Sequence, residues 1–210
     1  MTENDRTRDR VVARCNWPVR VFRPDEQPSD DLSDITTAEQ RLAMMWPLAL
    51  VAWTLAGMSL SEGDCQHVDF LTSLTAAGAR FLVVGAHAMA VYGVPRATGD
   101  LDIWVATDHE NVEKIWRALA SFGVPVDALG VSGQVLRTSR TVVQIGVPPR
   151  RIDLMTGLSG LDFEKAWPNR VMYRLGRDDV PFLGRDDFMA NKRATGRLKD
   201  LADLEILEKG

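Results

Sequence analysis

The feature that most constrains the fold is the stretch from Phe81 to Val105, FLVVGAHAMAVYGVPRATGDLDIWV. Its first four residues are apolar and predict a buried strand, and a turn at Gly85 leads into a short helix over 86–92. After a loop, a second apolar strand carries Asp100 and Asp102. The stretch therefore predicts a strand, a turn, a helix and a strand, with two carboxylates inside an otherwise apolar strand.

The two carboxylates lie two residues apart, which decides where they point. Side chains alternate along a strand, so Asp100 and Asp102 share one face, about 6.5 to 7 Å apart at Cα, while Leu101 and Ile103 face the core. Such a pair can bind one or two divalent cations, and Mg²⁺ is usually held by one or two carboxylates plus substrate phosphates. Beside a glycine turn and a helix start, the pair predicts a site for a nucleotide polyphosphate. The alternative is two solvent-facing acids at the end of an edge strand.

These residues carry a family resemblance. Gly85-Ala86, then thirteen residues, then Asp100-Leu101-Asp102-Ile103 resembles the signature of the polymerase-beta-like nucleotidyltransferase superfamily. The stretch is similar to minimal bacterial nucleotidyltransferases, including the toxin-type enzymes of abortive-infection toxin–antitoxin systems. The resemblance implies an α/β (α+β) fold, a mixed sheet with packed helices. Ala86 stands where the family has Ser or Gly, so only backbone N–H groups can contact a phosphate there.

A third acid is implied by the same resemblance. Arg151-Ile152-Asp153-Leu154 places one carboxylate among apolar residues, and the family delivers its third metal ligand from such a neighbouring strand. Asp153 is therefore the expected third ligand. The alternative is a strand residue paired with Arg151. Asp162 and Glu164 are rivals, although the start of a helix over 161–167 would explain both acids by the helix dipole.

Cations gather near the C-terminus and just before the acidic strand. The segment 191–204, NKRATGRLKDLADL, resembles the lysine motif of the toxin-related nucleotidyltransferases, with Gly196 between two helices. Lys192 and Lys199 are the expected phosphate ligands, and the alternative is a surface pair of Lys199 with Asp203. Arg96 fits equally well as a phosphate or acceptor ligand and as a partner of Asp100.

The resemblance implies nucleotidyl transfer, in which an acceptor hydroxyl attacks the α-phosphorus of a nucleoside triphosphate and pyrophosphate leaves. Asp100 and Asp102 would hold two Mg²⁺ or Mn²⁺ ions, Asp153 would complete the site of one of them, and Gly85 and Ala86 would bind phosphates. The acceptor would be an RNA or tRNA 3′ hydroxyl or a protein side chain, and a cognate partner protein is implied. The alternative function is a catalytically weakened nucleotide-binding or antitoxin-like interaction module, which Ala86 favours.

The chain divides into an N-terminal segment, 1–62, and a nucleotidyltransferase domain, 63–210. The first 35 residues predict an irregular arm. The uncharged run 42–61 is long enough for a membrane helix, but its proline, glycine and hydroxyl residues favour a helix buried against the domain or a docking partner. We expect a cytoplasmic protein without membrane contact. A further helix is predicted over 68–77, and another begins at a capping box of Thr107 and Glu110 and continues through Val112 to Phe122. Further strands are predicted over 134–138, 141–145, 151–155, 171–175 and 180–183.

Composition adds two constraints. The net charge of the 210 residues is −4, yet residues 137–199 hold thirteen Lys or Arg against seven Asp or Glu. That basic half suits a polyanionic substrate, and it equally suits a solvated surface without a ligand. The two cysteines, Cys15 and Cys65, indicate free thiols and no zinc site, and the three histidines show no clustering in the sequence.

Overall fold

The computed structural model describes residues 14, 17–26, 66–94, 98–126, 133–147, 150–175 and 177–209. Predictions that concern the run 42–61, Arg96 and both cysteines lie outside these residues. The described helices show none that is long and apolar enough to cross a membrane. The mixed α/β fold that the sequence predicts is confirmed by a single sheet with helices packed against it.

The sheet of the described residues has seven strands in the order β1-β4-β5-β3-β2-β7-β6. The strands are β1 (Val19–Phe22), β2 (Phe81–Val83), β3 (Asp100–Val105), β4 (Val142–Ile145), β5 (Arg151–Met155), β6 (Val171–Leu175) and β7 (Asp178–Phe182). The pairs β3 with β5 and β2 with β7 are parallel, and the other pairs are antiparallel. The predicted N-terminal arm thus contributes an edge strand, β1, which pairs with β4.

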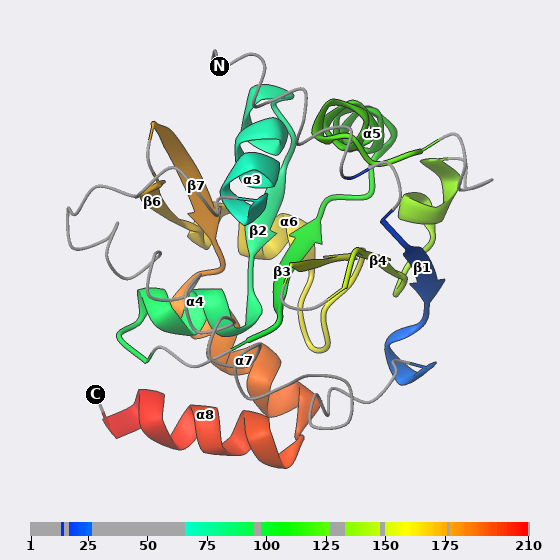
Figure 1. The fold of residues 1–210 in the computed structure, drawn as a ribbon. Coiled ribbons are helices and arrows are strands. Elements are labelled where there is room, and N and C mark those ends of the chain that lie inside the picture. The colour runs from blue at the N-terminus through cyan, green and yellow to red at the C-terminus, as the bar shows by residue number, and fades with distance from the viewer. Residues whose placement is uncertain are drawn as a thin grey trace.

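Helices cover both faces of this sheet (Figure 1). They are α3 (Gln66–Ala76), α4 (Gly85–Val91), α5 (His109–Phe122), α6 (Phe163–Ala166), α7 (Arg185–Thr195) and α8 (Leu198–Lys209). Three short 3₁₀ turns, η1 (Pro24–Glu26), η2 (Gly133–Arg137) and η3 (Trp167–Asn169), lie between them. Figure 1 shows α3 in front of the sheet and α6 behind it, while α4, α7 and α8 lie together at one end.

The predicted strand, turn, helix and strand over Phe81 to Val105 is confirmed as β2, α4 and β3. Leu101 and Ile103 are fully buried, as the alternation along the strand requires. They join a continuous core, in which α3 and α5 also pack against each other through Phe70 and Phe122. The largest buried side chains of this core include Phe70, Leu74, Phe81, Trp104, Ile115 and Phe122.

Two local predictions are wrong. Residues 134–137 belong to the 3₁₀ turn η2 and Thr138 follows it, so no strand forms at 134–138; the edge of β4 that could receive such a strand is already paired with β1. Helix α5 is capped by Asp108 rather than Thr107. The Asp108 side chain accepts a hydrogen bond from the backbone N–H of Asn111 at 3.0 Å, as an N-cap residue does.

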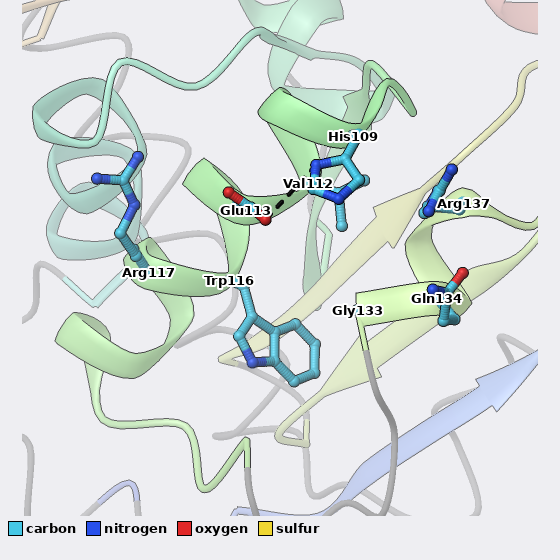
Figure 2. A pocket seen from close by; sticks show the side chains of 8 residues that line it. All are labelled: His109, Val112, Glu113, Trp116, Arg117, Gly133, Gln134 and Arg137. Atoms are coloured by element: carbon cyan, nitrogen blue, oxygen red, sulfur yellow. Dashed lines mark ion pairs between the residues drawn. The ribbon is translucent and has the colours of Figure 1, made fainter.

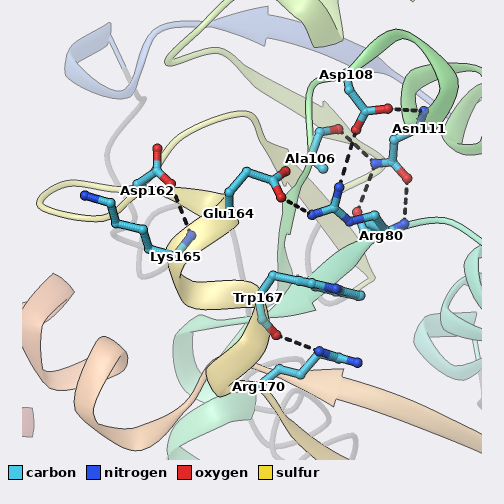
Figure 3. Close-up of polar contacts among 9 residues, drawn as sticks. All are labelled: Arg80, Ala106, Asp108, Asn111, Asp162, Glu164, Lys165, Trp167 and Arg170. Atoms are coloured by element: carbon cyan, nitrogen blue, oxygen red, sulfur yellow. Dashed lines mark hydrogen bonds and ion pairs between the residues drawn. The ribbon is translucent and has the colours of Figure 1, made fainter.

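Asn111 fixes the start of α5 to the rest of the fold (Figure 3). Its side-chain amide donates to the carbonyls of Ala106 and Arg80 at 2.8 and 2.9 Å and accepts from the Arg80 N–H at 2.6 Å. The helix ends at Gly123, whose φ of 96° is the left-handed conformation that a glycine C-cap provides. These contacts fix the C-terminal end of β3 in place. Asp100 and Asp102 lie at the opposite, N-terminal end of the strand.

Candidate functional site

Three carboxylates converge on β3 and β5. In the parallel pairing of these strands Asp102 lies opposite Asp153, and Asp100 lies opposite Arg151. Because side chains alternate, all four side chains project from the same face of the sheet. One oxygen from each of Asp100, Asp102 and Asp153 lies within 4.8 Å of the others. The structure therefore brings together the three acids that the sequence singled out.

The glycine turn closes over this cluster. Gly85 has φ of +63°, and a Cβ added to it would lie 2.8 Å from Asp102 Cγ and closer still to Oδ2. A residue with a side chain would therefore push the Asp102 carboxylate out of place. The backbone N–H of Val84 donates to the Asp102 carbonyl at 3.0 Å, which holds the turn against β3. Ala86 follows as a buried residue of α4, with only 1% of its surface exposed.

Further polar groups hold the carboxylates in position. The guanidinium of Arg151 contacts Asp100 through Nη2 and lies 3.1 Å from Asp153 Oδ1 through Nε. The hydroxyl of Thr98 donates to Asp100 Oδ1. Gln144, which lies opposite Asp153 in the pairing of β4 and β5, hydrogen-bonds to the Asp153 side chain. The sequence-based interpretation named Arg151 only as an alternative partner of Asp153, although its position two residues before Asp153 places both on one face.

Burial changes the acidity of Asp153, which is 2% exposed. Burial raises the pKa of this carboxyl to about 6, and the neighbouring Asp100 carboxylate acts in the same direction. The Arg151 guanidinium opposes both effects and keeps the pKa from rising further. A carboxyl that titrates near neutrality can exchange a proton during a reaction.

Two histidines meet next to this region, although their spacing along the chain shows no clustering. The rings of His67 and His87 lie edge to face with centroids 5.6 Å apart. Neither ring nitrogen of His87 has a hydrogen-bond partner among the described residues. Burial lowers the pKa of His67 to about 3 and that of His87 to about 4, so both rings are neutral at pH 7. His87 is buried at 2% exposure and faces its neighbour rather than solvent.

The lysine motif forms a buried charge cluster between α7 and α8. Lys192 Nζ donates to Asp200 at 2.5 Å and to Asp203 at 2.9 Å, and its side chain is only 7% exposed. Arg197 Nε also donates to Asp200 at 2.7 Å. Although burial acts to raise the pKa of Asp200, these hydrogen bonds lower it below its ordinary value. Lys199 lies on the exposed side of α8.

The rival acids have structural roles (Figure 3). Asp162 caps α6 by accepting from the backbone N–H of Lys165 at 3.1 Å. Glu164 accepts from Arg80 at 2.6 Å. Neither belongs to the group of carboxylates that could hold a cation in the described residues.

A cavity of about 410 Å³ lies between α5 and η2. Figure 2 shows it lined by His109, Val112, Glu113, Trp116, Arg117, Gly133, Gln134 and Arg137. His109 begins α5, directly beyond the end of β3 that lies opposite the acids. This cavity therefore lies beyond the end of β3 that is farther from the acids.

No family model matches the sequence, and no curated protein matches it significantly. Among solved structures, the fold is similar to a protein of Thermotoga maritima described as a "putative nucleotidyltransferase". The sequence identity is 16% and the TM-score 0.41, over 68% of this chain and 88% of the other.

Proposed function

We propose that this chain is a metal-dependent nucleotidyltransferase that moves a nucleoside monophosphate from a nucleoside triphosphate to an acceptor hydroxyl and releases pyrophosphate. The observation that carries the proposal is the convergence of Asp100, Asp102 and Asp153 on two adjacent parallel strands under the Gly85 turn. The residues of the acidic motif that suggested nucleotidyl transfer are the same residues that lie together in the folded protein.

The cluster fits a hard divalent cation. Its donors are carboxylate oxygens, which Mg²⁺ and Mn²⁺ prefer, and their mutual distances of up to 4.8 Å are close to the ~4.2 Å that spans two opposite ligands of one such ion. Asp100, Asp102 and Asp153 would hold the cation, whose chemistry is to lower the pKa of the acceptor hydroxyl and offset phosphate charge.

The other residues take supporting roles in this proposal. Gly85 keeps the Asp102 carboxylate in place and, with Ala86, presents backbone N–H groups to the phosphates. Asp153 is both the third ligand of the cation and the group that accepts the proton of the acceptor hydroxyl. Lys199, exposed on α8, and Arg96 are proposed phosphate ligands. For Lys192 the same role competes with its ion pairs to Asp200 and Asp203.

The proposed acceptor is an RNA 3′ hydroxyl, with tRNA as the first candidate, or a protein side chain. The excess of thirteen cations over seven acids in residues 137–199 favours RNA. Because the motifs resemble those of toxin-type enzymes, we also propose that the protein works in the cytoplasm as part of a toxin–antitoxin system. In that case it would have a cognate partner protein.

The test is a label-transfer assay. The purified protein is incubated with Mg²⁺ or Mn²⁺, each α-labelled nucleoside triphosphate in turn, and either total RNA or cell protein. We expect label in one acceptor class with the unmodified chain and with the control Asp179→Asn, which removes an exposed carboxylate on β7. We expect none with Asp100→Asn. Equal labelling by Asp100→Asn would refute the assignment.

The second candidate is a nucleotide-binding or antitoxin-like module without turnover. Ala86 favours it, because this residue lacks the hydroxyl or the extra freedom of the family's Ser or Gly and is buried in α4. Such a module would bind a nucleoside triphosphate with Mg²⁺ and label no acceptor. Appearance of activity in Ala86→Ser, with no activity in the unmodified chain, would support this second function over the first.

A further inference from the structure

Arg151 lies inside the carboxylate cluster rather than beside it. Four side chains form a block on one face of β3 and β5, with Asp100 opposite Arg151 and Asp102 opposite Asp153. Three corners of this block are carboxylates, and the fourth is a guanidinium that contacts two of them. Arg151 is 8% exposed, so its charge is enclosed with theirs.

We propose that Arg151 is the resident counter-charge of this site and takes the place of a second metal ion, so that the cluster binds one divalent cation. This inference rests on the proposed function, since it concerns the same carboxylates. It changes the expectation of two metal ions that the family resemblance implies.

The first argument is charge. Three ionised carboxylates and one guanidinium sum to −2, which one divalent cation neutralises. A second divalent cation would leave the nucleotide-free block at +2. Like charges within a few ångströms in a region of low dielectric repel strongly, and an arginine cannot relieve the repulsion by losing its proton.

The second argument is the supply of oxygen lone pairs. Asp100 accepts from Thr98 at Oδ1 and from Arg151 at Oδ2, so each of its oxygens is already used once. Asp153 Oδ1 lies 3.1 Å from Arg151 Nε in an ion pair without hydrogen-bond geometry, and the Asp153 side chain hydrogen-bonds to Gln144. A carboxylate offers about four lone-pair positions on its two oxygens, so these contacts leave at most one on each oxygen of Asp100. They therefore reduce the positions that Asp100 can offer to a second cation.

The third argument is that Arg151 is held where it lies. Its backbone belongs to β5 and is paired on both sides, with β3 and with β4. To leave, its side chain would have to give up a charge-assisted hydrogen bond to Asp100, which is among the stronger contacts in proteins, and an ion pair with Asp153. The guanidinium therefore stays in the site when a cation binds.

The test counts bound Mn²⁺ by electron paramagnetic resonance, with and without a non-hydrolysable nucleoside triphosphate analogue. Two Mn²⁺ ions about 3.5 to 4 Å apart give an exchange-coupled spectrum, whereas one ion does not. The variants are Arg151→Leu, which removes the charge, and Arg151→Lys, which keeps it. Arg174→Leu, at an exposed ion pair on β6, is the matched control.

We expect one uncoupled Mn²⁺ per chain in the unmodified protein, in Arg151→Lys and in Arg174→Leu, in both conditions. In Arg151→Leu we expect the first Mn²⁺ to bind at least tenfold more tightly than in the unmodified protein. With the analogue we expect a second, coupled Mn²⁺, and we expect Mn²⁺ to raise the melting temperature more than it does in the unmodified protein. A coupled pair in the unmodified protein would refute the inference and leave the proposed function standing. No bound Mn²⁺ in either condition would refute the metal centre itself, and with it both proposals.

Discussion

The buried lysine between α7 and α8 gives the sharpest prediction. Replacing Lys192 with methionine keeps most of its apolar stem and removes its charge. The carboxylates of Asp200 and Asp203, which are 0% and 6% exposed, then lose the cation that neutralises both. Because these acids are enclosed between two helices, water cannot replace the lost partner.

The magnitude follows from the geometry. Removing one partner of a buried ion pair typically lowers the free energy of unfolding by about 3 to 5 kcal/mol, because an uncompensated charge remains. Arg197 still pairs with Asp200 at 2.7 Å in the variant. We therefore expect Lys192→Met to lie at the lower end, at about 3 kcal/mol. The loss of unfolding free energy is larger at neutral pH than in acid. The pKa of Asp200 is lowered in the folded protein, so its ion pairs stabilise the fold above the ordinary pKa of 3.8, and this stabilisation fades as the pH falls.

Urea denaturation followed by circular dichroism measures this change. The matched control is Arg193→Met, which breaks an exposed ion pair with Glu208 between the same two helices and should cost less than about 1 kcal/mol. Adding Asp200→Asn and Asp203→Asn to Lys192→Met should recover most of the loss.

The refuting result is also specific. If Lys192 serves as a phosphate ligand, Lys192→Met weakens nucleotide binding and leaves the free energy of unfolding within about 0.5 kcal/mol of the unmodified protein. That outcome would show that the ion pairs contribute little and that the sequence-based role of Lys192 is correct.

Three further predictions concern the carboxylate site and its surroundings. Asp102→Asn should abolish label transfer without lowering the melting temperature, because removing one of three like charges relieves repulsion; a lower melting temperature would contradict this. Gly85→Ala should abolish label transfer and lower the free energy of unfolding, measured in urea, by about 2 kcal/mol or more, because its Cβ would clash with Asp102. The control Gly93→Ala, at a φ of +83° with open space around it, should lower the free energy of unfolding by about 1 kcal/mol and keep label transfer. In the unmodified chain, His87 is protonated below about pH 6.5 in the unfolded state but only below about pH 4 in the folded state. The free energy of unfolding therefore falls as the pH drops from 6.5 to 4, by up to about 1.4 kcal/mol per pH unit. His67, with its pKa lowered to about 3, adds a slope of the same sign, and Asp153, with its pKa raised to about 6, opposes it below pH 6. His87→Leu should therefore change the slope by the contribution of one histidine in denaturation curves measured from pH 4.5 to 7.5, and an unchanged slope would exclude that contribution.

The sequence predicts the parts of this molecule that depend on local patterns. The apolar strand, the glycine turn and the alternation of Asp100 and Asp102 define β2, α4 and β3 almost to the residue. The amphipathic helix that ends at Gly123 is equally local. The approach of Asp153 to the other acids needed the family resemblance, because the spacing along the chain does not fix which strands become neighbours.

What the sequence misses depends on contacts between distant residues. Residues 134–138 have the composition of a strand, but they turn into η2 because β1 occupies the edge of β4. The ion pairs of Arg151 and Lys192, and the contact of His67 with His87, join residues that are brought together only by the folded chain. A charged residue in a sequence pattern does not show whether its partner will be a ligand or another side chain.

The pairing of β1 with β4 has a consequence for how the chain reaches its native state and how it can be handled. The two strands are about 120 residues apart in sequence, so this pairing closes a long loop and is expected to form late. Until it forms, β4 presents unpaired backbone groups along four apolar or buried residues. A fragment that starts at residue 63 would keep that edge open permanently and would be prone to aggregate through it. We therefore expect residues 17–26 to be needed for soluble expression of the region that carries the carboxylate site.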